Sequence, residues 1–271
     1  MGHDLDHVLE RCRVTADFDL DDHDPREKFG WDKAWGKAKF AEEIALVADL
    51  QKRLFAEDER AVLVVLQAMD AGGKGGVVRS VMSNLNPAGV EVTGFGKPTE
   101  EELAHDFLWR VHANTPARGR IGIFDRSHYE DVLVVRVREL VPEKVWRRRY
   151  DHIVNFEELL TDEGTDVVKF FLNISSEEQR ERLQDRVDDP DEQWKFRLGD
   201  LDDRALWDDY MAAFQDALRK TSTDAAPWYA VPGDRKWVRN LVVAHALRRV
   251  LESIDPEYPP AEEDVDGLVI D

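Results

Sequence analysis

Apolar and polar positions follow one another along the chain in a way that predicts strands and helices in turn. The run Ala61 to Leu66 is apolar throughout, which is typical of a strand buried on both faces of a parallel sheet. Four further stretches complete a set of predicted strands at residues 61–66, 90–95, 120–124, 166–174 and 228–231. The remaining periodic stretches predict helices at residues 32–56, about 76–85, 99–111, 128–140, 175–187, 201–220 and 235–253.

Local start signals support two of these helices. Thr99 with Glu102, and Ser175 with Glu178, have the spacing of a capping box, in which side chains satisfy the free backbone N–H groups of a first turn. Strands that alternate with helices predict an α/β fold with a mostly parallel sheet. Because the 271 residues show no internal repeat and no linker, we expect a single domain.

The net charge of −20 is distributed unevenly. Residues 1–27 hold nine acids and three bases, and residues 255–271 hold seven acids and no base. Such runs are usually solvated, so we expect an acidic N-terminal arm over 1–29 and an acidic C-terminal tail over 255–271, on either side of a domain over 30–254. Residues 110–149 are the exception, with ten bases against five acids.

Composition excludes several classes of protein. A single cysteine, Cys12, rules out a disulfide scaffold and a CxxC zinc site, and it fits a reducing compartment. No leader-like pattern is visible at the N-terminus, and the longest apolar run is too short to cross a bilayer, so we expect a cytoplasmic protein with no membrane partner. The acidic balance argues against a nucleic-acid partner.

A glycine-rich segment, Gln67-Ala-Met-Asp-Ala-Gly-Gly-Lys-Gly-Gly76, joins the first predicted strand to a helix, which is the setting of a phosphate-binding loop. Against the pattern G-x-x-x-x-G-K-[ST], Ala68 replaces the first glycine and Gly75 replaces the Ser/Thr that ligates Mg²⁺. Lys74 would contact the transferred phosphate, and Asp70 could replace the missing metal ligand. The glycines that would let backbone N–H groups approach an anion are Gly72, Gly73, Gly75 and Gly76. The alternative is a glycine-rich turn without a ligand.

Asp125-Arg126 follows the third predicted strand. Ligand chemistry in α/β folds gathers at the carboxyl ends of strands, so Asp125 is a candidate second Mg²⁺ ligand and Arg126 a candidate for forked contacts to phosphate. The alternative is that Asp125 caps the next helix and that Arg126 pairs with an acid there. A phosphate loop on another strand favours the functional interpretation.

Residues 180–204 predict a lid that closes over phosphates. Arg182 and Arg186 lie on one helix face, and Lys195 and Arg197 follow the break at Asp188-Asp-Pro190. The segment holds six bases and nine acids, so charge alone would favour a salt-bridged surface helix pair instead.

These pieces, in this order, resemble the polyphosphate kinase 2 family. The likeness extends from about Gly30 to Arg249 and rests on matched segments at 66–76, 105–110, 118–133, 189–196 and 226–229. It implies a P-loop kinase-like parallel sheet between helices, with a helical lid. Its loop pattern places an Asp four residues before the Lys, as Asp70 stands here, and its second motif matches Asp125-Arg126.

The resemblance implies reversible, Mg²⁺-dependent phosphoryl transfer between inorganic polyphosphate and a nucleotide, with Mn²⁺ as a substitute metal. Asp70, Lys74, Asp125 and Arg126 would be catalytic, and Asp70 and Asp125 would hold the metal. The phosphate-binding residues would be Gly72, Gly73, Lys74, Gly75, Gly76, Arg79, Arg182, Arg186, Lys195 and Arg197. We expect polyphosphate to run along residues 110–149 and the lid.

Acceptor preference stays open. Lys74-Gly-Gly76 resembles the branch that prefers nucleoside diphosphates, whereas Tyr129 to Leu133 and His105 to Trp109 resemble the branch that phosphorylates mono- and diphosphates such as AMP and ADP. The base is open as well, guanine included, and we expect a homo-oligomer. Two rival interpretations are an ATP-dependent nucleoside monophosphate kinase of similar fold and a non-catalytic nucleotide sensor, which the retained Lys74 and Asp70 argue against.

Overall fold

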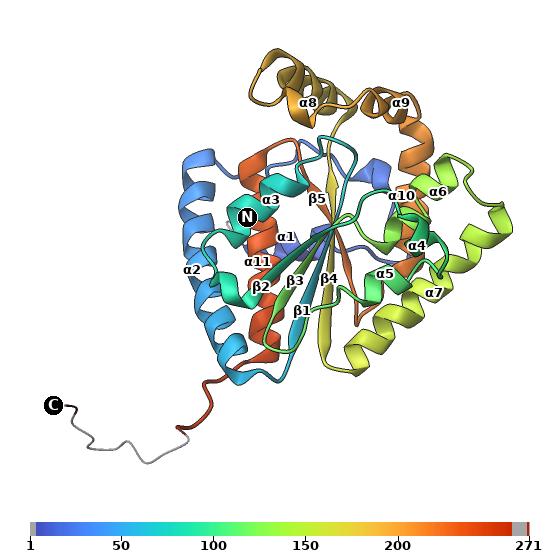
Figure 1. Ribbon diagram of the computed structural model, residues 1–271. Helices are drawn as coiled ribbons and strands as arrows, with labels where there is room; N and C mark the ends of the chain where they lie inside the picture. The colour runs from blue at the N-terminus through green and yellow to red at the C-terminus, as the bar shows by residue number, and fades with distance from the viewer. Residues whose placement is uncertain (1–3, 262–269, 271) are drawn as a thin grey trace.

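A computed structural model describes residues 4–261 and residue 270. Its centre is a parallel sheet in the order β2-β3-β1-β4-β5, seen edge-on between two layers of helices in Figure 1. The strands are β1 (Ala61–Gln67), β2 (Val90–Gly94), β3 (Ile121–Asp125), β4 (Thr165–Asn173) and β5 (Trp228–Pro232). Every predicted strand is confirmed, and so is the α/β fold.

The central strand β1 is buried along its whole length. Its side chains alternate between two apolar clusters: Val62 and Val64 point into one, Leu63 and Val65 into the other. A strand packed on both faces needs apolar residues at every position, which is why the 61–66 run has no polar interruption.

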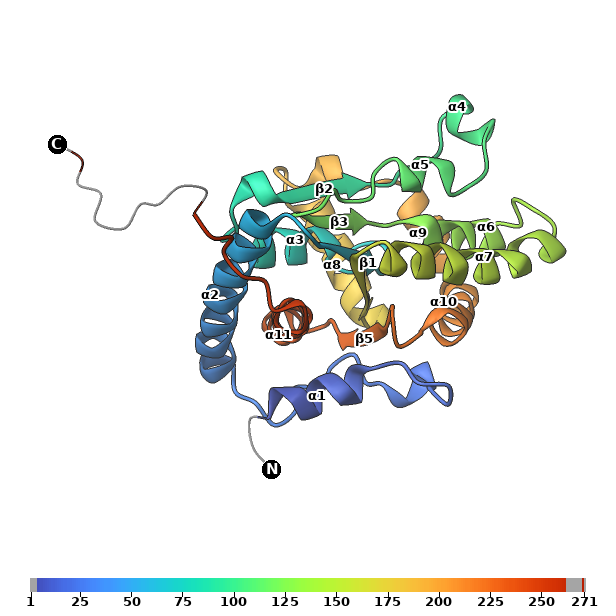
Figure 2. The same ribbon diagram turned by 90° about the horizontal axis from the view of Figure 1, so that it is seen from below.

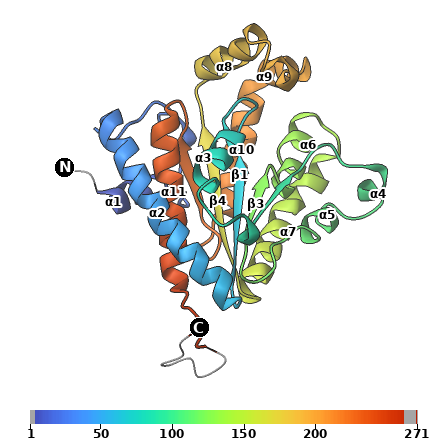
Figure 3. The ribbon, with the colours of Figure 1, turned by 60° about the vertical axis from the view of Figure 1, so that its left-hand side comes forward.

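Helices cover both faces of the sheet (Figures 1 and 2). On one face lie α2 (Lys33–Glu57), α3 (Lys74–Met82) and α11 (Lys236–Ile254). On the other lie α5 (Trp109–His112), α6 (Val134–Val137), α7 (Glu143–Asp162) and α10 (Trp207–Thr221). Above the carboxyl ends of the strands lie α8 (Ser176–Asp188) and α9 (Gly199–Ala205), which contain the segment predicted to be a lid (Figure 3). We call α8, α9 and the residues between them the lid region.

Three predicted helices are shorter than expected. The 99–111 helix is two short pieces, α4 (Glu100–Leu103) and α5, because Asp106 accepts a hydrogen bond from the N–H of Leu108 and forms a turn. In place of the 128–140 helix there are a 3₁₀ turn (His128–Asp131) and α6. The 201–220 helix is divided into α9 and α10 at Leu206, whose ψ of 27° is not helical.

Helix α7 was not predicted, because its run of arginines was interpreted as part of a basic segment and not as the polar face of an amphipathic helix. Trp146, Tyr150, Ile153 and Phe156 recur at helical spacing and are buried, while most charged positions face outward. Glu157 is the buried exception, and it pairs with the buried Lys169.

The expected solvated N-terminal arm is wrong for the described part of 1–29. Helix α1 (Leu5–Cys12) packs Leu5, Val8, Leu9 and Cys12 into the same cluster as α2 and α11, and Figure 2 shows it beneath β5 and α11. Its acids occupy only the outer face. Apolar residues at helical spacing, not net charge, decide burial here.

The expected C-terminal tail lies mostly outside the described residues. Residues 255–261 are described and carry Pro256, which is buried. Within the described part of the chain, no helix has the length and apolar character needed to cross a membrane.

Candidate active site

The phosphate loop leaves β1 and enters α3 through strained backbone. Ala71 has φ +60° and Gly73, the N-cap of α3, has φ +99°. Gly73 provides no side-chain cap, so the N–H groups of Lys74 and Gly75 can bind an anion, whereas that of Gly76 donates to the carbonyl of Gly73 at 3.0 Å. The sequence expectation of a strand, a glycine-rich turn and a helix is confirmed.

Lys74 is buried beneath this loop, with 8% of its surface exposed. Its Nζ donates to the carbonyl oxygen of Ala68, at 3.0 Å. Burial, and next the nearby cation Arg126, lower the pKa of Lys74 below its ordinary value, while the carboxylates of Asp70 and Asp125 oppose that shift. The amine is therefore held in place next to two acids, with its charge little screened by solvent.

The Asp125-Arg126 motif lies next to the phosphate loop, because both lie at the carboxyl ends of the adjacent strands β3 and β1. Asp125 is paired in register with Leu66 at the end of β1. Arg126 has φ +64°, and its N–H donates to the carbonyl of Leu66. Its Nη2 then reaches Oδ1 of Asp70 at 2.5 Å. The structure thus places Asp70, Lys74 and Arg126 in one charged group with Asp125 beside it.

Glu130 belongs to this group and was not predicted. Burial raises its pKa, and the charges of Arg126 and Lys74 oppose the shift. Among the carboxylates that raise the pKa of Arg126, against its burial, Glu130 acts most strongly. An acid four residues after Arg126 was the signal available in the sequence, but only the turn at 128–131 brings the two side chains together.

A pocket opens next to these charges. It is lined by loop residues 68–70, by Arg126 and Glu130, and on its far side by Tyr210 and Phe214 of α10. The loop side of the pocket is therefore charged, and the α10 side is aromatic and apolar except for Asp203, whose carboxylate accepts a hydrogen bond from the Tyr210 hydroxyl.

Arg182 of the lid helix α8 is tied to the backbone of the loop. Its Nη1 donates to the carbonyl of Ala71 at 3.1 Å, its Nη2 donates to that of Gly233 at 2.7 Å, and its Nε pairs with Glu178 at 2.7 Å. The Arg182 side chain thus links the lid region to the phosphate loop by hydrogen bonds, and it also places a positive charge next to that loop.

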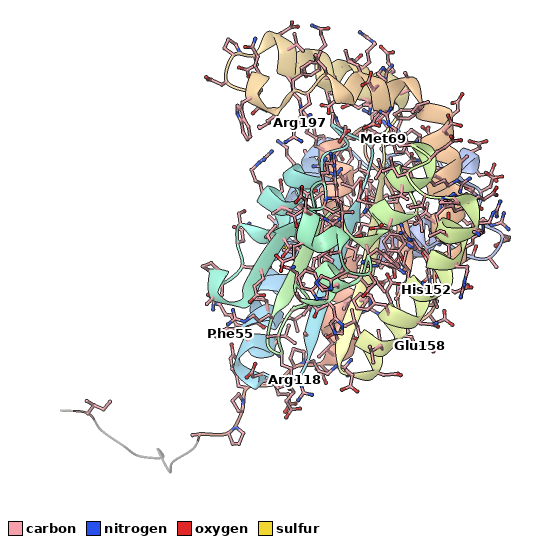
Figure 4. The ribbon with its side chains drawn as sticks, turned by 45° about the vertical axis from the view of Figure 1, so that its right-hand side comes forward. Phe55, Met69, Arg118, His152, Glu158 and Arg197 are labelled. Atoms are coloured by element: carbon pink, nitrogen blue, oxygen red, sulfur yellow. The ribbon has the colours of Figure 1, made fainter. Side chains whose placement is uncertain are left out.

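The other predicted lid bases differ in their settings. Arg186 pairs with Asp200 at 3.6 Å, and Lys195 pairs with Glu192. Arg197 is exposed, and Figure 4 places it at the end of the molecule where Met69 of the loop lies. Of the four predicted lid bases, Arg197 alone has no ion-pair partner among the described residues.

The structure does not support a polyphosphate path along residues 110–149. Arg118 lies at the opposite end of the molecule from Met69 (Figure 4). Most other bases of the segment pair locally, so their charges are compensated within the fold: Arg110 with Glu102, Arg120 with Glu91, Arg136 with Asp216, Arg138 with Asp203, Arg147 with Glu143 and Arg149 with Asp131.

Asp70 and Asp125 are the carboxylates that could hold a metal ion. Over the described ranges, no group of three or more His, Cys, Asp or Glu side chains is arranged to hold one. That donor set still fits Mg²⁺, which is usually bound through one or two carboxylates together with substrate phosphates and water.

Residues 30–259 match the family described as Polyphosphate kinase 2. The chain is 50% identical over 97% of its length, and over the whole of the relative, to an AMP/ADP-polyphosphate phosphotransferase from Meiothermus ruber. It is 45% identical to an ADP-polyphosphate phosphotransferase from Rhodopseudomonas palustris, covering 80% of this chain and 79% of that one.

A solved structure gives the same result. The crystal structure of polyphosphate kinase 2 from Arthrobacter aurescens superimposes with a TM-score of 0.92 at 45% identity, covering 97% of this chain and 94% of the other.

Proposed function

The chain belongs to the polyphosphate kinase 2 family, and from that premise we propose that it transfers a phosphoryl group reversibly between inorganic polyphosphate and a nucleoside mono- or diphosphate. The observation that carries the proposal is the convergence of Lys74, Asp70 and Arg126 at the free N-terminus of α3. Phosphoryl transfer depends mainly on positioning and on neutralising charge, and this group can do both.

Each residue of the group has a role that its position suggests. The N–H groups after Gly73, together with Lys74, would bind the oxygens of the phosphate that is transferred. Arg126 would stabilise the charge that develops as the phosphoryl group moves. Its present partner is Asp70, so we expect Asp70 to exchange Arg126 for a metal ion when the substrates bind.

We propose that Asp70 and Asp125 hold Mg²⁺, for which Mn²⁺ could substitute. The ion would neutralise phosphate charge and orient the phosphate oxygens. Within the protein, the two carboxylates provide the hard oxygen ligands that such an ion prefers.

We propose AMP and ADP as acceptors. The relative from Meiothermus ruber is named for both, whereas the Rhodopseudomonas relative is named for ADP. A relative from Corynebacterium glutamicum, 33% identical over 81% of this chain, is named as a putative GDP-polyphosphate phosphotransferase, so guanine nucleotides belong among the acceptors to be tried.

The test is a donor and acceptor assay. The protein is incubated with Mg²⁺, polyphosphate and either AMP or ADP, with no ATP, and the nucleotides are separated by chromatography. We expect ADP from AMP and ATP from ADP. An ATP-dependent nucleoside monophosphate kinase would instead convert AMP only when ATP replaces polyphosphate, and that result would overturn the proposal.

Two further expectations stay predictions. A homo-oligomer is checked by light scattering of the purified chain in solution. A cytoplasmic location is consistent with the one cysteine, Cys12, being a buried free thiol, and it is checked by fractionating cells that express the protein.

A further inference from the structure

Arg239 is a buried cation next to the phosphate loop, and the roles above leave it unassigned. It lies in the first turn of α11 and is 2% exposed. A Cβ built on Gly73 would overlap its Nη1, and one built on Gly76 would lie 3.0 Å from its Nη2. The guanidinium group therefore lies directly against the loop backbone, at positions that carry no side chain.

No carboxylate compensates this charge in the described part of the chain. Nε and Nη2 of Arg239 donate to Oδ1 of Asn240, at 3.1 and 2.8 Å, and Nη1 has no acceptor there. Burial, and then the charges of Arg182 and Arg79, lower the pKa of Arg239 to about 10. Buried charges are normally paired, because an unpaired one loses its hydration without compensation.

Two further arginines converge on the same part of the loop. Nη1 of Arg182 would lie 3.3 Å from a Cβ on Gly73, and Nη1 of Arg79 would lie 3.7 Å from one on Gly75. We call Arg79, Arg182 and Arg239 the arginine cluster. Its charges add to the positive end of the α3 dipole. Glu178 compensates Arg182, whereas the charge of Arg239 has no carboxylate partner among the described residues, so an anion bound here would offset it.

We propose that the arginine cluster binds a phosphate group at the N-terminus of α3 and that Arg239 is its buried anchor. The inference rests on the proposed function, which supplies phosphate from polyphosphate or from a nucleotide. Nη1 and Nη2 of Arg182 already donate to backbone carbonyls, so this residue would act on the phosphate mainly through its charge. Arg239 keeps Nη1 free, next to the N-cap, for a direct hydrogen bond to a phosphate oxygen.

The experiment replaces Arg239 with an apolar side chain of similar length, Arg239→Met. Thermal unfolding is measured for the ligand-free protein, with sodium tripolyphosphate, and with ADP. Arg249→Gln is the matched control, because Arg249 lies on the same helix, is half-exposed and pairs with Glu252. Initial rates with polyphosphate give KM and kcat.

We expect ligand-free Arg239→Met to unfold at or above the wild-type temperature, since an uncompensated buried charge has been removed. The rise in unfolding temperature caused by tripolyphosphate should be lost, and KM for polyphosphate should increase by about tenfold to a hundredfold, as expected for one hydrogen bond to a charged group. Loss of the ADP-induced rise instead would also support the anion site and would identify the nucleotide as the source of its phosphate.

If tripolyphosphate and ADP still raise the unfolding temperature of Arg239→Met as much as that of the wild type, the inference is overturned. A much lower ligand-free unfolding temperature with both rises intact would also overturn it, and would show that Arg239 only packs the core. If Arg239→Met does not fold, Arg239→Lys keeps the charge without the fork and should bind tripolyphosphate more weakly than wild type, and unchanged binding would again overturn the inference. A wild-type chain that binds tripolyphosphate through Arg239 but forms no ATP would contradict the proposed function alone.

Discussion

Asp70 is paired with Arg126, and it is also one of the two carboxylates proposed above to hold Mg²⁺. Replacing it by Asn keeps the shape and a hydrogen bond to Arg126 but removes one of two candidate metal ligands. We expect kcat of Asp70→Asn to fall by about a hundredfold or more, since a bound metal contributes several kcal/mol to such transfers. Asp49→Asn on α2, where Asp49 pairs with Arg53 on the surface, is the control. Near-normal turnover of the Asp70 variant would remove Asp70 from the mechanism.

Gly75 and Gly76 are neighbours in one helix but meet different surroundings. A Cβ on Gly75 would make an ordinary contact, 3.7 Å from Arg79, whereas one on Gly76 would lie 3.0 Å from the buried Arg239. We expect Gly76→Ala to lower the free energy of unfolding by about 1–3 kcal/mol through overpacking. Gly75→Ala should leave it unchanged or raise it slightly, because Ala is the better helix former. Equal effects in urea denaturation would contradict this account.

At the residue scale, the loop and the Asp125-Arg126 motif were predictable because local spacing fixes them. Glu130 and Arg239 were not, because a turn and a distant helix deliver them to the site. The sequence pattern identified the basic residues of the lid, but it could not predict which groups they contact, because those contacts are tertiary. Arg182, for example, donates to backbone carbonyls of two distant loops.

Helices α2 and α11 are joined by a buried ionic contact. Glu43 of α2 accepts hydrogen bonds from Nε of Arg248 at 2.6 Å and contacts Nδ1 of His245 at 3.0 Å. Burial alone would raise the pKa of Glu43, but His245 and Arg248 overcome it and hold that pKa at about 2, against 4.5 for a free glutamate. The lowered pKa means that this stabilisation is complete above pH 4.5 and is lost as the pH falls toward 2.

We therefore expect Glu43→Gln to lower the free energy of unfolding by about 3 kcal/mol at pH 7. The difference from wild type should shrink as the pH falls below the ordinary glutamate value. Glu42→Gln is the control, since Glu42 is exposed on the same helix. Urea denaturation at several pH values measures both, and a difference that stays constant with pH would contradict the linkage.

Helix α1 is a second element that lies differently from the prediction: the acidic net charge of this segment predicted a solvated arm, but the apolar face of α1 is buried. Leu9 is buried against the core, whereas its neighbour Glu10 is exposed. We expect Leu9→Ala to lower the free energy of unfolding by about 2–5 kcal/mol, and Glu10→Ala to change it little. Equal denaturation midpoints for the two variants would restore the view of a solvated arm.

At the scale of the elements, all five strands and most helices follow from periodicity. The misplaced boundaries fall where single side chains make turns, as at Asp106, or where a helix is interrupted, as at Leu206. These are contacts of individual residues, which a period averaged over a window does not resolve.

The whole molecule is strongly acidic, with a net charge of −20, yet its proposed substrates are polyanions. Exposed acids repel polyphosphate over a range that salt shortens to about 10 Å at 0.1 M, whereas the charges around the loop are largely buried and less screened. We expect activity to depend strongly on Mg²⁺ and KM for polyphosphate to hold or fall as NaCl is raised to moderate concentrations. A steep rise in KM over that range would show that exposed cations dominate binding.

Formation of ATP from ADP, with polyphosphate as the sole donor, is the decisive test of phosphoryl transfer at the α3 loop. Phosphorus NMR would follow the reaction for wild type, for Lys74→Ala and for Arg249→Gln. We predict ATP from wild type and from Arg249→Gln, and a rate at least about a hundredfold lower for Lys74→Ala with an unchanged fold. Absence of ATP from the wild-type chain, or a near-normal rate for Lys74→Ala, would contradict the account.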